Sequence, residues 1–445
     1  MMTKELELYI HIPFCVRKCR YCDFLSAAYE EGTKTAYMQA LFQEIGQRAA
    51  DCQGYEVVSV FIGGGTPSVL GVAQIEKLMG VIRSHYILRQ DAEITIEVNP
   101  GTVENPGTRK MSAKEGEEPE ERSAGGSAEE KSKPLEGCRM NTGQEAAEKR
   151  LEMAENRFDA YRKAGINRLS IGLQSANDGE LKALGRIHTF QNFLDTYQAA
   201  LEAGFDNINV DLMSGIPGQT LESYEKTLRT VISLDPAPTH ISAYSLIVEE
   251  GTPFFELQKE GRLMLPDEET DREMYHLTKS ILKKAGYERY EISNYAKKGY
   301  ECRHNIGYWK RAEYLGFGIG AASLFRGTRF KNGENIREYC LNPCGVREES
   351  EILDKKDCME EFMFLGLRMM EGVSFTEFRC CFGEELGKIY GAVIEKNIKD
   401  GLMFVYEKSK LEKAYKPEAL AENNCLALTD KGIDVSNYVM AQFLI

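Results

Sequence analysis

The chain has 445 residues, of which 42% are hydrophobic, and a formal net charge of −14 at pH 7. This length allows one large domain and a smaller one, and the negative charge argues against a nucleic-acid-binding role, which needs clustered Lys and Arg. No apolar run reaches the roughly 18 residues of a transmembrane helix. Because the first seven residues lack an apolar signal region, we expect a cytoplasmic protein. Twelve cysteines in such a chain indicate reduced thiols rather than a disulfide framework.

Segments typical of strands alternate with helical segments along the first 250 residues. This alternation predicts parallel βαβ units. We expect helices at 35–48 and 75–83, and strands at 6–12, 57–62, 94–98, 168–173, 207–212 and 239–246.

The stretch 104–150 interrupts this alternation, because it contains almost no large apolar residue and includes an acidic run at 114–121. Such a composition buries too little surface to offset the entropy of ordering. We predict a disordered insertion over 105–145, which a loop tolerates because closure entropy grows slowly with length.

The pattern changes again after about residue 350. Helical segments are expected at 361–370, 384–398 and 430–443, and short strands at 402–406 and 425–428. These elements predict a separate small α+β domain over 351–445.

Three cysteines, Cys15, Cys19 and Cys22, follow the first expected strand with the spacing C-x3-C-x2-C. Three thiolates on one loop can hold three corners of a [4Fe–4S] cluster and leave one iron open. A zinc knuckle and free thiols are the alternatives. Zinc usually takes four ligands in two pairs, and no second C-x2-C pair follows.

Glycines and polar residues recur where the other expected strands end. The run Gly63–Pro67 includes Gly64, Gly65 and Thr66, and Glu97, Gln174, Arg186 and Asp211 lie at or near later strand ends. Any one of them could be a solvated or capping residue. Because the carboxyl ends of parallel strands meet on one face of an α/β barrel, together they predict one pocket.

The cysteine spacing, directly after Tyr9-Ile10-His11-Ile12-Pro13-Phe14, resembles the radical SAM superfamily. The resemblance implies an α/β fold: a partial (β/α)6 barrel built from 1–104 and 146–250, completed and linked onward by 251–350. It also implies a [4Fe–4S] cluster whose open iron binds S-adenosylmethionine (SAM).

Within that superfamily the motifs resemble the oxygen-independent coproporphyrinogen III oxidase group. The resemblance implies that Tyr9, Gly64 and Glu97 contact the cluster-bound SAM. It implies that a second SAM in the oxidase is contacted at the positions of Tyr21, Gly65, Thr66, Gln174, Arg186 and Asp211.

Two departures from the oxidase pattern point to the HemW family of haem chaperones. Phe24 stands where the oxidase has a fourth cysteine, and only 14 residues precede Cys15. Stretches at 184–189, 290–296, 303–309 and 428–444 also resemble HemW. The resemblance implies haem as cargo and apo-haem recipients such as respiratory enzymes. It leaves room for a homodimer and for peripheral membrane association through the recipients.

His304 is the candidate for haem contact, since neutral imidazole is a common haem ligand and Trp309 lies five residues on. The alternatives are a structural role for His304, which would hold the linker against the barrel, and ligation by Cys302. Two rival activities stay open: oxidative decarboxylation of coproporphyrinogen III to protoporphyrinogen IX, and radical SAM chemistry on another substrate.

Overall fold

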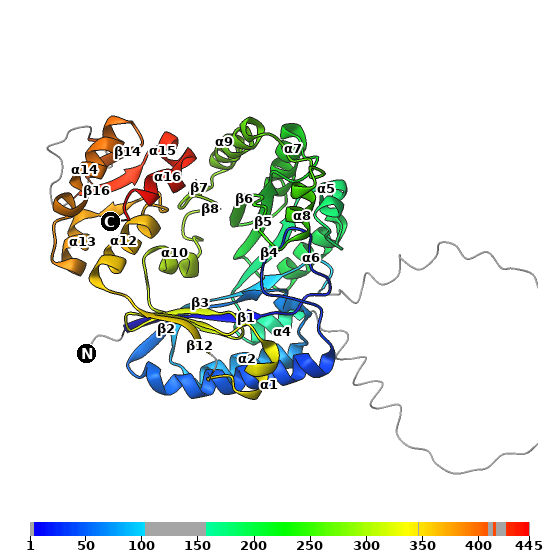
Figure 1. The fold of residues 1–445 in the computed structure, drawn as a ribbon. Helices are drawn as coiled ribbons and strands as arrows, with labels where there is room; N and C mark the ends of the chain where they lie inside the picture. The colour runs from blue at the N-terminus through cyan, green and yellow to red at the C-terminus, as the bar shows by residue number, and fades with distance from the viewer. Residues whose placement is uncertain (1–3, 103–156, 346, 408–412, 415–423, 445) are drawn as a thin grey trace, which may run out of the picture.

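The computed structural model describes residues 4–102, 157–345, 347–407, 413–414 and 424–444 (Figure 1). The insertion predicted over 105–145 lies outside the described residues. None of the described helices combines the length and apolar character needed to cross a membrane.

Six parallel strands form the centre of a 12-stranded sheet (Figure 1). They lie side by side in chain order, each parallel to the next. This order confirms the predicted α/β fold with successive parallel units. The strands are β1 (Lys4–Ile12), β2 (Tyr55–Gly64), β3 (Leu88–Val98), β4 (Arg168–Gln174), β5 (Ile208–Ser214) and β6 (His240–Ser245).

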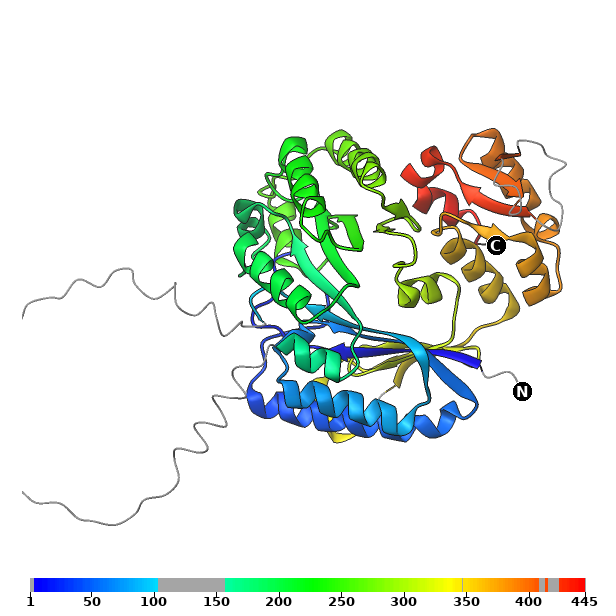
Figure 2. The ribbon, with the colours of Figure 1, turned by 180° about the vertical axis from the view of Figure 1, so that it is seen from behind.

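Helices cover the outer face of this curved sheet (Figure 2). Two of them, α6 and α7, start at a threonine whose hydroxyl accepts from the third backbone N–H of the helix, which fixes where each helix begins. The helices of this part of the chain are α1 (Glu31–Arg48), α2 (Val72–His85), α4 (Arg157–Lys163), α5 (Asp178–Ala183), α6 (Phe190–Glu202), α7 (Leu221–Ile232), α8 (Pro253–Lys259) and α9 (Glu268–Lys284), of which α8 packs against the cysteine loop.

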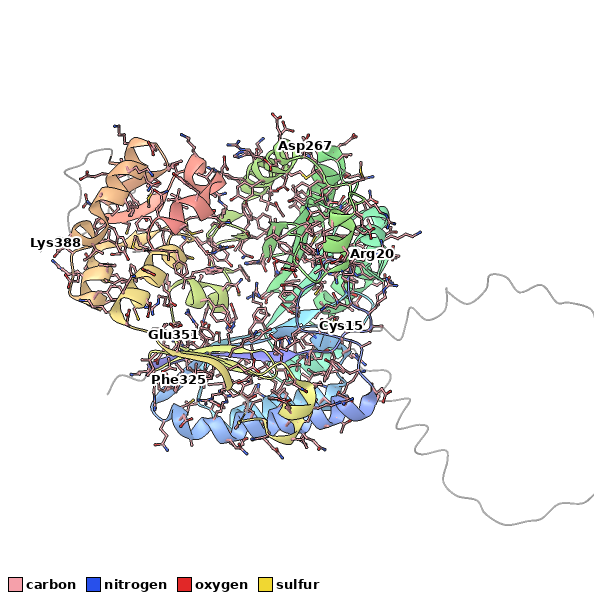
Figure 3. All side chains as sticks on the ribbon, viewed as in Figure 1. Cys15, Arg20, Asp267, Phe325, Glu351 and Lys388 are labelled. Atoms are coloured by element: carbon pink, nitrogen blue, oxygen red, sulfur yellow. The ribbon has the colours of Figure 1, made fainter. Side chains whose placement is uncertain are left out.

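Short strands extend the sheet at both edges. Strand β9 (Tyr314–Phe317) pairs parallel to β1, and β10 (Ala322–Phe325), β11 (Thr328–Asn332) and β12 (Arg347–Ile352) follow antiparallel. Figure 3 labels Phe325 and Glu351 on this extension. At the other edge, β8 (Asn294–Ala296) and β7 (Glu288–Arg289) pair antiparallel beyond β6. Helices α10 (Arg303–Trp309) and α11 (Ile336–Leu341) lie in this part of the chain.

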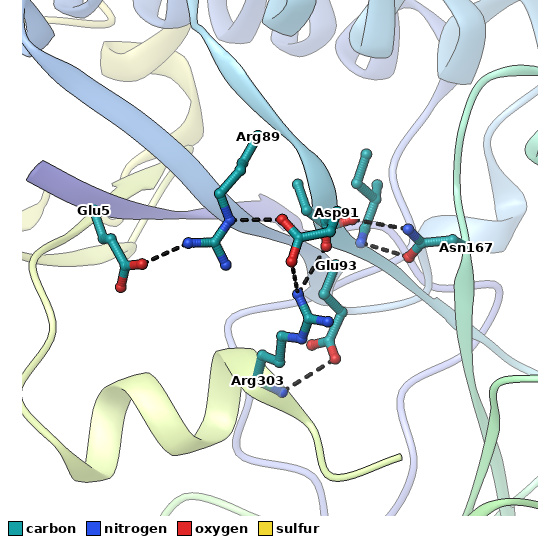
Figure 4. Close-up of polar contacts among 8 residues, drawn as sticks. Glu5, Arg89, Asp91, Glu93, Asn167 and Arg303 are labelled. Atoms are coloured by element: carbon teal, nitrogen blue, oxygen red, sulfur yellow. Dashed lines mark hydrogen bonds and ion pairs between the residues drawn. The ribbon is translucent and has the colours of Figure 1, made fainter. Parts of the chain in front are cut away.

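The third strand begins six residues before its predicted start at residue 94. Its first half carries charged side chains: Arg89 donates to Glu5 (2.5 Å) and Asp91 (2.6 Å), and Arg303 donates to Asp91 (3.1 Å) (Figure 4). These groups are largely exposed. Hydrophobic periodicity therefore misses this half of the strand.

A buried carboxylate on α1 ties the helix to the edge extension. Glu44 accepts from the backbone N–H of Gly318 (2.9 Å), from Asn332 Nδ2 (2.9 Å) and from the Tyr339 hydroxyl (2.6 Å). It also pairs with Arg48 at 2.8 Å, and both side chains are almost fully buried. Through these partners the buried carboxylate joins three separate elements. Without them, burying its charge would cost free energy of folding.

The C-terminal part has its own hydrophobic cluster and its own sheet, in the order β13-β16-β14-β15. The predicted helix over 430–443 is two short helices, because the backbone leaves helical geometry at Val435. The elements are α12 (Lys355–Gly366), β13 (Val373–Ser374), α13 (Phe375–Phe382), α14 (Leu386–Lys399), β14 (Met403–Glu407), β15 (Lys413–Ala414), β16 (Asn424–Leu428), α15 (Asp430–Asp434) and α16 (Ser436–Ala441).

Glu44→Ala should lower the free energy of unfolding by about 3–5 kcal/mol, because it leaves Arg48 buried without its counter-charge. Urea unfolding of the full chain measures the loss. Glu31→Ala is the control, since Glu31 forms an exposed pair with Lys34, and such pairs contribute about 1 kcal/mol or less. Equal losses in the two variants would contradict the role given to Glu44.

Candidate functional site

A cavity of about 510 Å³ opens at the carboxyl ends of the central strands. It brings together most of the residues that the sequence predicts for the site, from the cysteine loop and from the ends of β2 to β5. Those lining it are Cys15, Cys19, Cys22, Tyr21, Gly64, Gly65, Thr66, Glu97, Gln174, Arg186 and Asp211. The two predicted residues that do not line it are Tyr9 and His304.

Backbone hydrogen bonds hold the cysteine loop at its ends and in its middle. The N–H of Cys15 donates to the carbonyl of Ala27 (3.0 Å). Arg20 donates its N–H to Leu184 (3.0 Å) and accepts at its carbonyl from Phe254 (3.1 Å). Figure 3 labels Cys15 and Arg20 at the right of the view, where this loop lies. The loop is therefore fixed between the sheet and the helices that follow β4 and β6.

The three thiols are free, partly exposed and directed to one cavity. Cys15 Sγ lies 3.5 Å from Thr66 Oγ1, and Cys19 Sγ lies 4.0 Å from Arg186 Nη1. Burial raises the pKa of the Cys22 thiol to about 11, so metal binding there must displace a proton.

The arrangement of the three cysteine thiols indicates which metal group they could hold. Among the described residues, no three His, Cys, Asp or Glu side chains converge closely enough to hold a single metal ion. A cluster presents a different iron atom to each thiolate. Three thiols that line one open cavity could therefore each hold a different iron of a [4Fe–4S] cluster.

Gly64 and Glu97 join the ends of β2 and β3. The N–H of Gly64 donates to Glu97 Oε2 at 3.0 Å. Gly64 has a φ of +110°, and a Cβ there would lie 2.5 Å from His11 Nδ1, so only glycine allows this approach. Burial and then the charge of Asp211 raise the pKa of Glu97 to about 8.

Burial also raises the pKa of Asp211. Two carboxylates that repel each other in one cavity gain most from a ligand carrying positive charge and hydroxyl groups. SAM, with its sulfonium, ammonium and ribose groups, has that chemistry.

Tyr9 lies one layer behind the cavity wall. Its hydroxyl is 3.0 Å from His11 Nδ1, while His11 Nε2 lies 2.9 Å from the carbonyl of Leu25. Because a carbonyl only accepts, Nε2 carries the proton, and Nδ1 accepts from Tyr9. Tyr9 stacks on Phe61, which does line the cavity. Tyr9 therefore positions Phe61 in the wall, and His11, which the sequence reasoning missed, holds the Tyr9 hydroxyl from behind.

Strand β4 ends in a strained residue. Gln174 has a φ of +73°, uncommon for a residue with a side chain, and its amide oxygen accepts from the Tyr244 hydroxyl at 2.9 Å. Nearby, Arg186 donates to Asn99 Oδ1 and to the carbonyl of Gly172, both at 2.8 Å. These bonds commit both Nη atoms of Arg186 to the cavity wall.

Asn209 and Asp211 form a polar pair on β5. Asn209 Nδ2 donates to Asp211 Oδ1 (2.7 Å), and Ser170 Oγ donates to Asp211 Oδ2 (3.3 Å). The two residues are separated by one, so they point to the same face of the strand. This spacing was the available sequence signal for Asn209, which was missed together with Asn99 and Tyr244.

His304 is buried inside the molecule, at 1% exposure. Its Nδ1 lies 2.8 Å from Ser59 Oγ, and its Nε2 lies 3.0 Å from the Tyr308 hydroxyl. Burial lowers the pKa of His304 to about 3, so the ring is neutral. Ligation of haem iron by His304 would therefore break at least one hydrogen bond. The geometry favours the structural role.

The neighbours of His304 are also engaged. Cys302 is fully buried and donates to Glu93 Oε1 at 3.4 Å, and the guanidinium of Arg368 lies over the ring of Trp309 at 4.3 Å. Neither the thiol nor that indole face is open to a porphyrin in this structure.

Comparison with known proteins agrees with the geometry. Residues 9–114 and 128–231 match the family model of the radical SAM superfamily, and residues 353–404 match that of the HemN C-terminal domain. The fold is similar to that of coproporphyrinogen III oxidase HemN from Escherichia coli, with a TM-score of 0.73 at 21% identity, covering 100% of this chain and 91% of that one. Fold and cavity define a radical SAM protein.

Similarity to named relatives shows to which family of radical SAM proteins the chain belongs. The chain is 31% identical to heme chaperone HemW of Lactococcus lactis, covering 100% of this chain and 99% of the relative. It is 35% identical to HemW of Bacillus subtilis over 89% and 92%, and 37% identical to HemW of Escherichia coli over 84% and 85%. The chain belongs to the HemW family.

Cys19→Ser should remove most of the cluster iron and the brown colour after anaerobic reconstitution, because a hydroxyl is a poor substitute for a thiolate ligand. Iron and sulfide analysis with absorbance spectra measures the loss. Cys380→Ser, an exposed thiol on α13, should keep the full iron content. A full cluster in the Cys19 variant would exclude the triad as the ligand set.

His304→Ala should lower the free energy of unfolding by about 2–5 kcal/mol, since it opens a cavity and leaves Ser59 and Tyr308 without their partner. His276→Ala, at a half-exposed ring paired with Asp434, should cost about 1 kcal/mol or less. Urea unfolding of the apo protein compares them. Normal stability combined with a lost haem spectrum would instead assign haem ligation to His304.

Proposed function

We propose that the protein binds haem and delivers it to apo-haem proteins. The main support is the position of Phe24 in a chain similar along its length to proteins named heme chaperone. Phe24 lines the cavity mouth and is 62% exposed. The oxidase group has a further thiol there, so an apolar side chain removes a potential ligand and adds a surface for an apolar guest.

The mouth of the cavity suits a porphyrin. Ile247, which is 68% exposed, also lines it. Large exposed apolar side chains at the rim of a cavity are typical of binding sites. Porphyrin faces are apolar, so covering Phe24 and Ile247 with haem would remove apolar surface from water on both partners.

We propose that Cys15, Cys19 and Cys22 hold a [4Fe–4S] cluster. When bound, the cluster and SAM supply one-electron chemistry at the sulfonium. This chain orients SAM through the Gly64 backbone and the carboxylate of Glu97. The second set of proposed SAM contacts comprises Tyr21, Gly65, Thr66, Gln174, Arg186 and Asp211.

We further propose a cytoplasmic protein that meets its recipients, such as respiratory enzymes, at the membrane. The net charge of −14 disfavours direct binding to anionic lipid headgroups, which attract clustered Lys and Arg. Any membrane association would therefore pass through the recipient. A homodimer formed in the cluster-loaded state remains part of the proposal.

Anaerobic titration of the reconstituted protein with haemin should give a saturable Soret band at about one haem per chain, because the cavity has room for a single such guest. The complex should survive gel filtration. In parallel, coproporphyrinogen III with SAM and reductant should give no protoporphyrinogen IX. Turnover of that substrate without stable haem binding would replace the chaperone with the oxidase.

A further inference from the structure

One arginine at the cavity floor has no assigned role in the proposed site. Arg168 begins β4 and lines the cavity, yet is only 2% exposed. Side chains alternate along a strand, so Arg168 shares the inward face with Ser170, Gly172 and Gln174. It lies deeper than these residues, two positions before the Ser170–Glu97 pairing of β4 with β3.

The guanidinium of Arg168 is uncommitted. Its Nε is buried without a hydrogen-bond partner, and the hydrogen bonds and ion pairs among the described residues include none from this side chain. A buried guanidinium without partners is unusual and calls for an explanation. Arg186, in the same cavity, provides the contrast, since both its Nη atoms donate to the wall.

The carboxylates nearest Arg168 are already engaged. Glu93 accepts from the N–H groups of Arg303 (3.1 Å) and His304 (3.2 Å), at the start of α10. Asp211 accepts from Asn209 and Ser170. These charges help to keep a cation buried, but their oxygens are directed to other donors. The guanidinium N–H groups of Arg168 are therefore available to donate to a ligand.

Neutral polar and apolar side chains line the cavity together with its charged groups. Asn294, with a buried Oδ1 that has no partner, and Asn305 are among the polar ones, and Phe61, Met213 and Leu246 are among the apolar ones. Such a cavity suits a ligand with an apolar body and one carboxylate at its end. Guanidinium groups bind carboxylates through paired N–H donors.

We propose that Arg168 forms a carboxylate subsite at the cavity floor that takes one propionate group of haem. This inference rests on the proposed function, because it assigns a contact to the haem that the chaperone would carry. The residues proposed for SAM lie nearer the strand ends. Arg168 would fix which edge of the porphyrin enters first.

The test compares haemin with haemin dimethyl ester, in which both propionates are neutral, by anaerobic absorbance titration of the full reconstituted chain. The wild type should bind haemin about tenfold or more tightly than the diester, as expected for a hydrogen-bonded charged group. Arg168→Gln should reduce this preference to about twofold or less, and Arg168→Lys should keep part of it.

Arg17→Gln is the matched control, because Arg17 lines the mouth of the same cavity and its Nη2 already donates to the carbonyl of Gly185 at 2.6 Å. It should keep the full preference for haemin. Loss of the preference in the Arg17 variant would place the carboxylate at the mouth and overturn the subsite.

Three further outcomes would overturn the subsite. If the wild type binds haemin and the diester equally, the subsite alone is refuted. This comparison does not depend on whether a variant folds. An Arg168→Gln protein that loses SAM binding but keeps the preference assigns the guanidinium to SAM instead. A wild type that binds neither porphyrin refutes the proposed function, and the subsite with it.

Discussion

The parallel register of β1 to β6 is the constraint on which the rest of the molecule depends. It brings six strand ends to one edge of the sheet, so residues far apart in sequence, such as Cys15 and Asp211, face one cavity. Parallel strands require long connections, and the helices that supply them cover the outer face. The interior face is left for the site, and the cysteine loop closes over it after β1.

The same arrangement forces charge into the interior. Burial raises the pKa of both Glu97 and Asp211, and the charge of Asp211 raises that of Glu97 further, while Arg168 and Arg186 lie in the same cavity. A site with both signs of charge held apart by neutral amides and hydroxyls is suited to ligands that themselves carry both signs. Buried charge of this kind adds little to stability, so binding is the better explanation for its presence.

Sequence reasoning predicted the fold because strand-like runs alternate with helical ones along the chain. The strands are buried on both faces, as β4 is along its whole length. It predicted the cavity wall because residues such as Gly64 and Glu97 lie at the ends of the expected strands. It missed the charged half of β3, whose stability comes from pairing rather than apolar burial. It also missed Arg168, since a lone arginine opening a strand is usually a solvated end. It left the structural role of His304 open as an alternative to haem contact, because the buried partner Ser59 is 245 residues away.

The pairing of β9 with β1 has a consequence for biosynthesis. Residues 7–10 pair with residues 314–317, so one edge of the first strand stays without its neighbour until the chain has passed β9. At the usual rate of about 5–20 residues per second, that interval is roughly 15–60 s. An unpaired edge is a site for wrong pairing, and the cysteine loop rests on that strand. We therefore expect cluster insertion to follow completion of the chain.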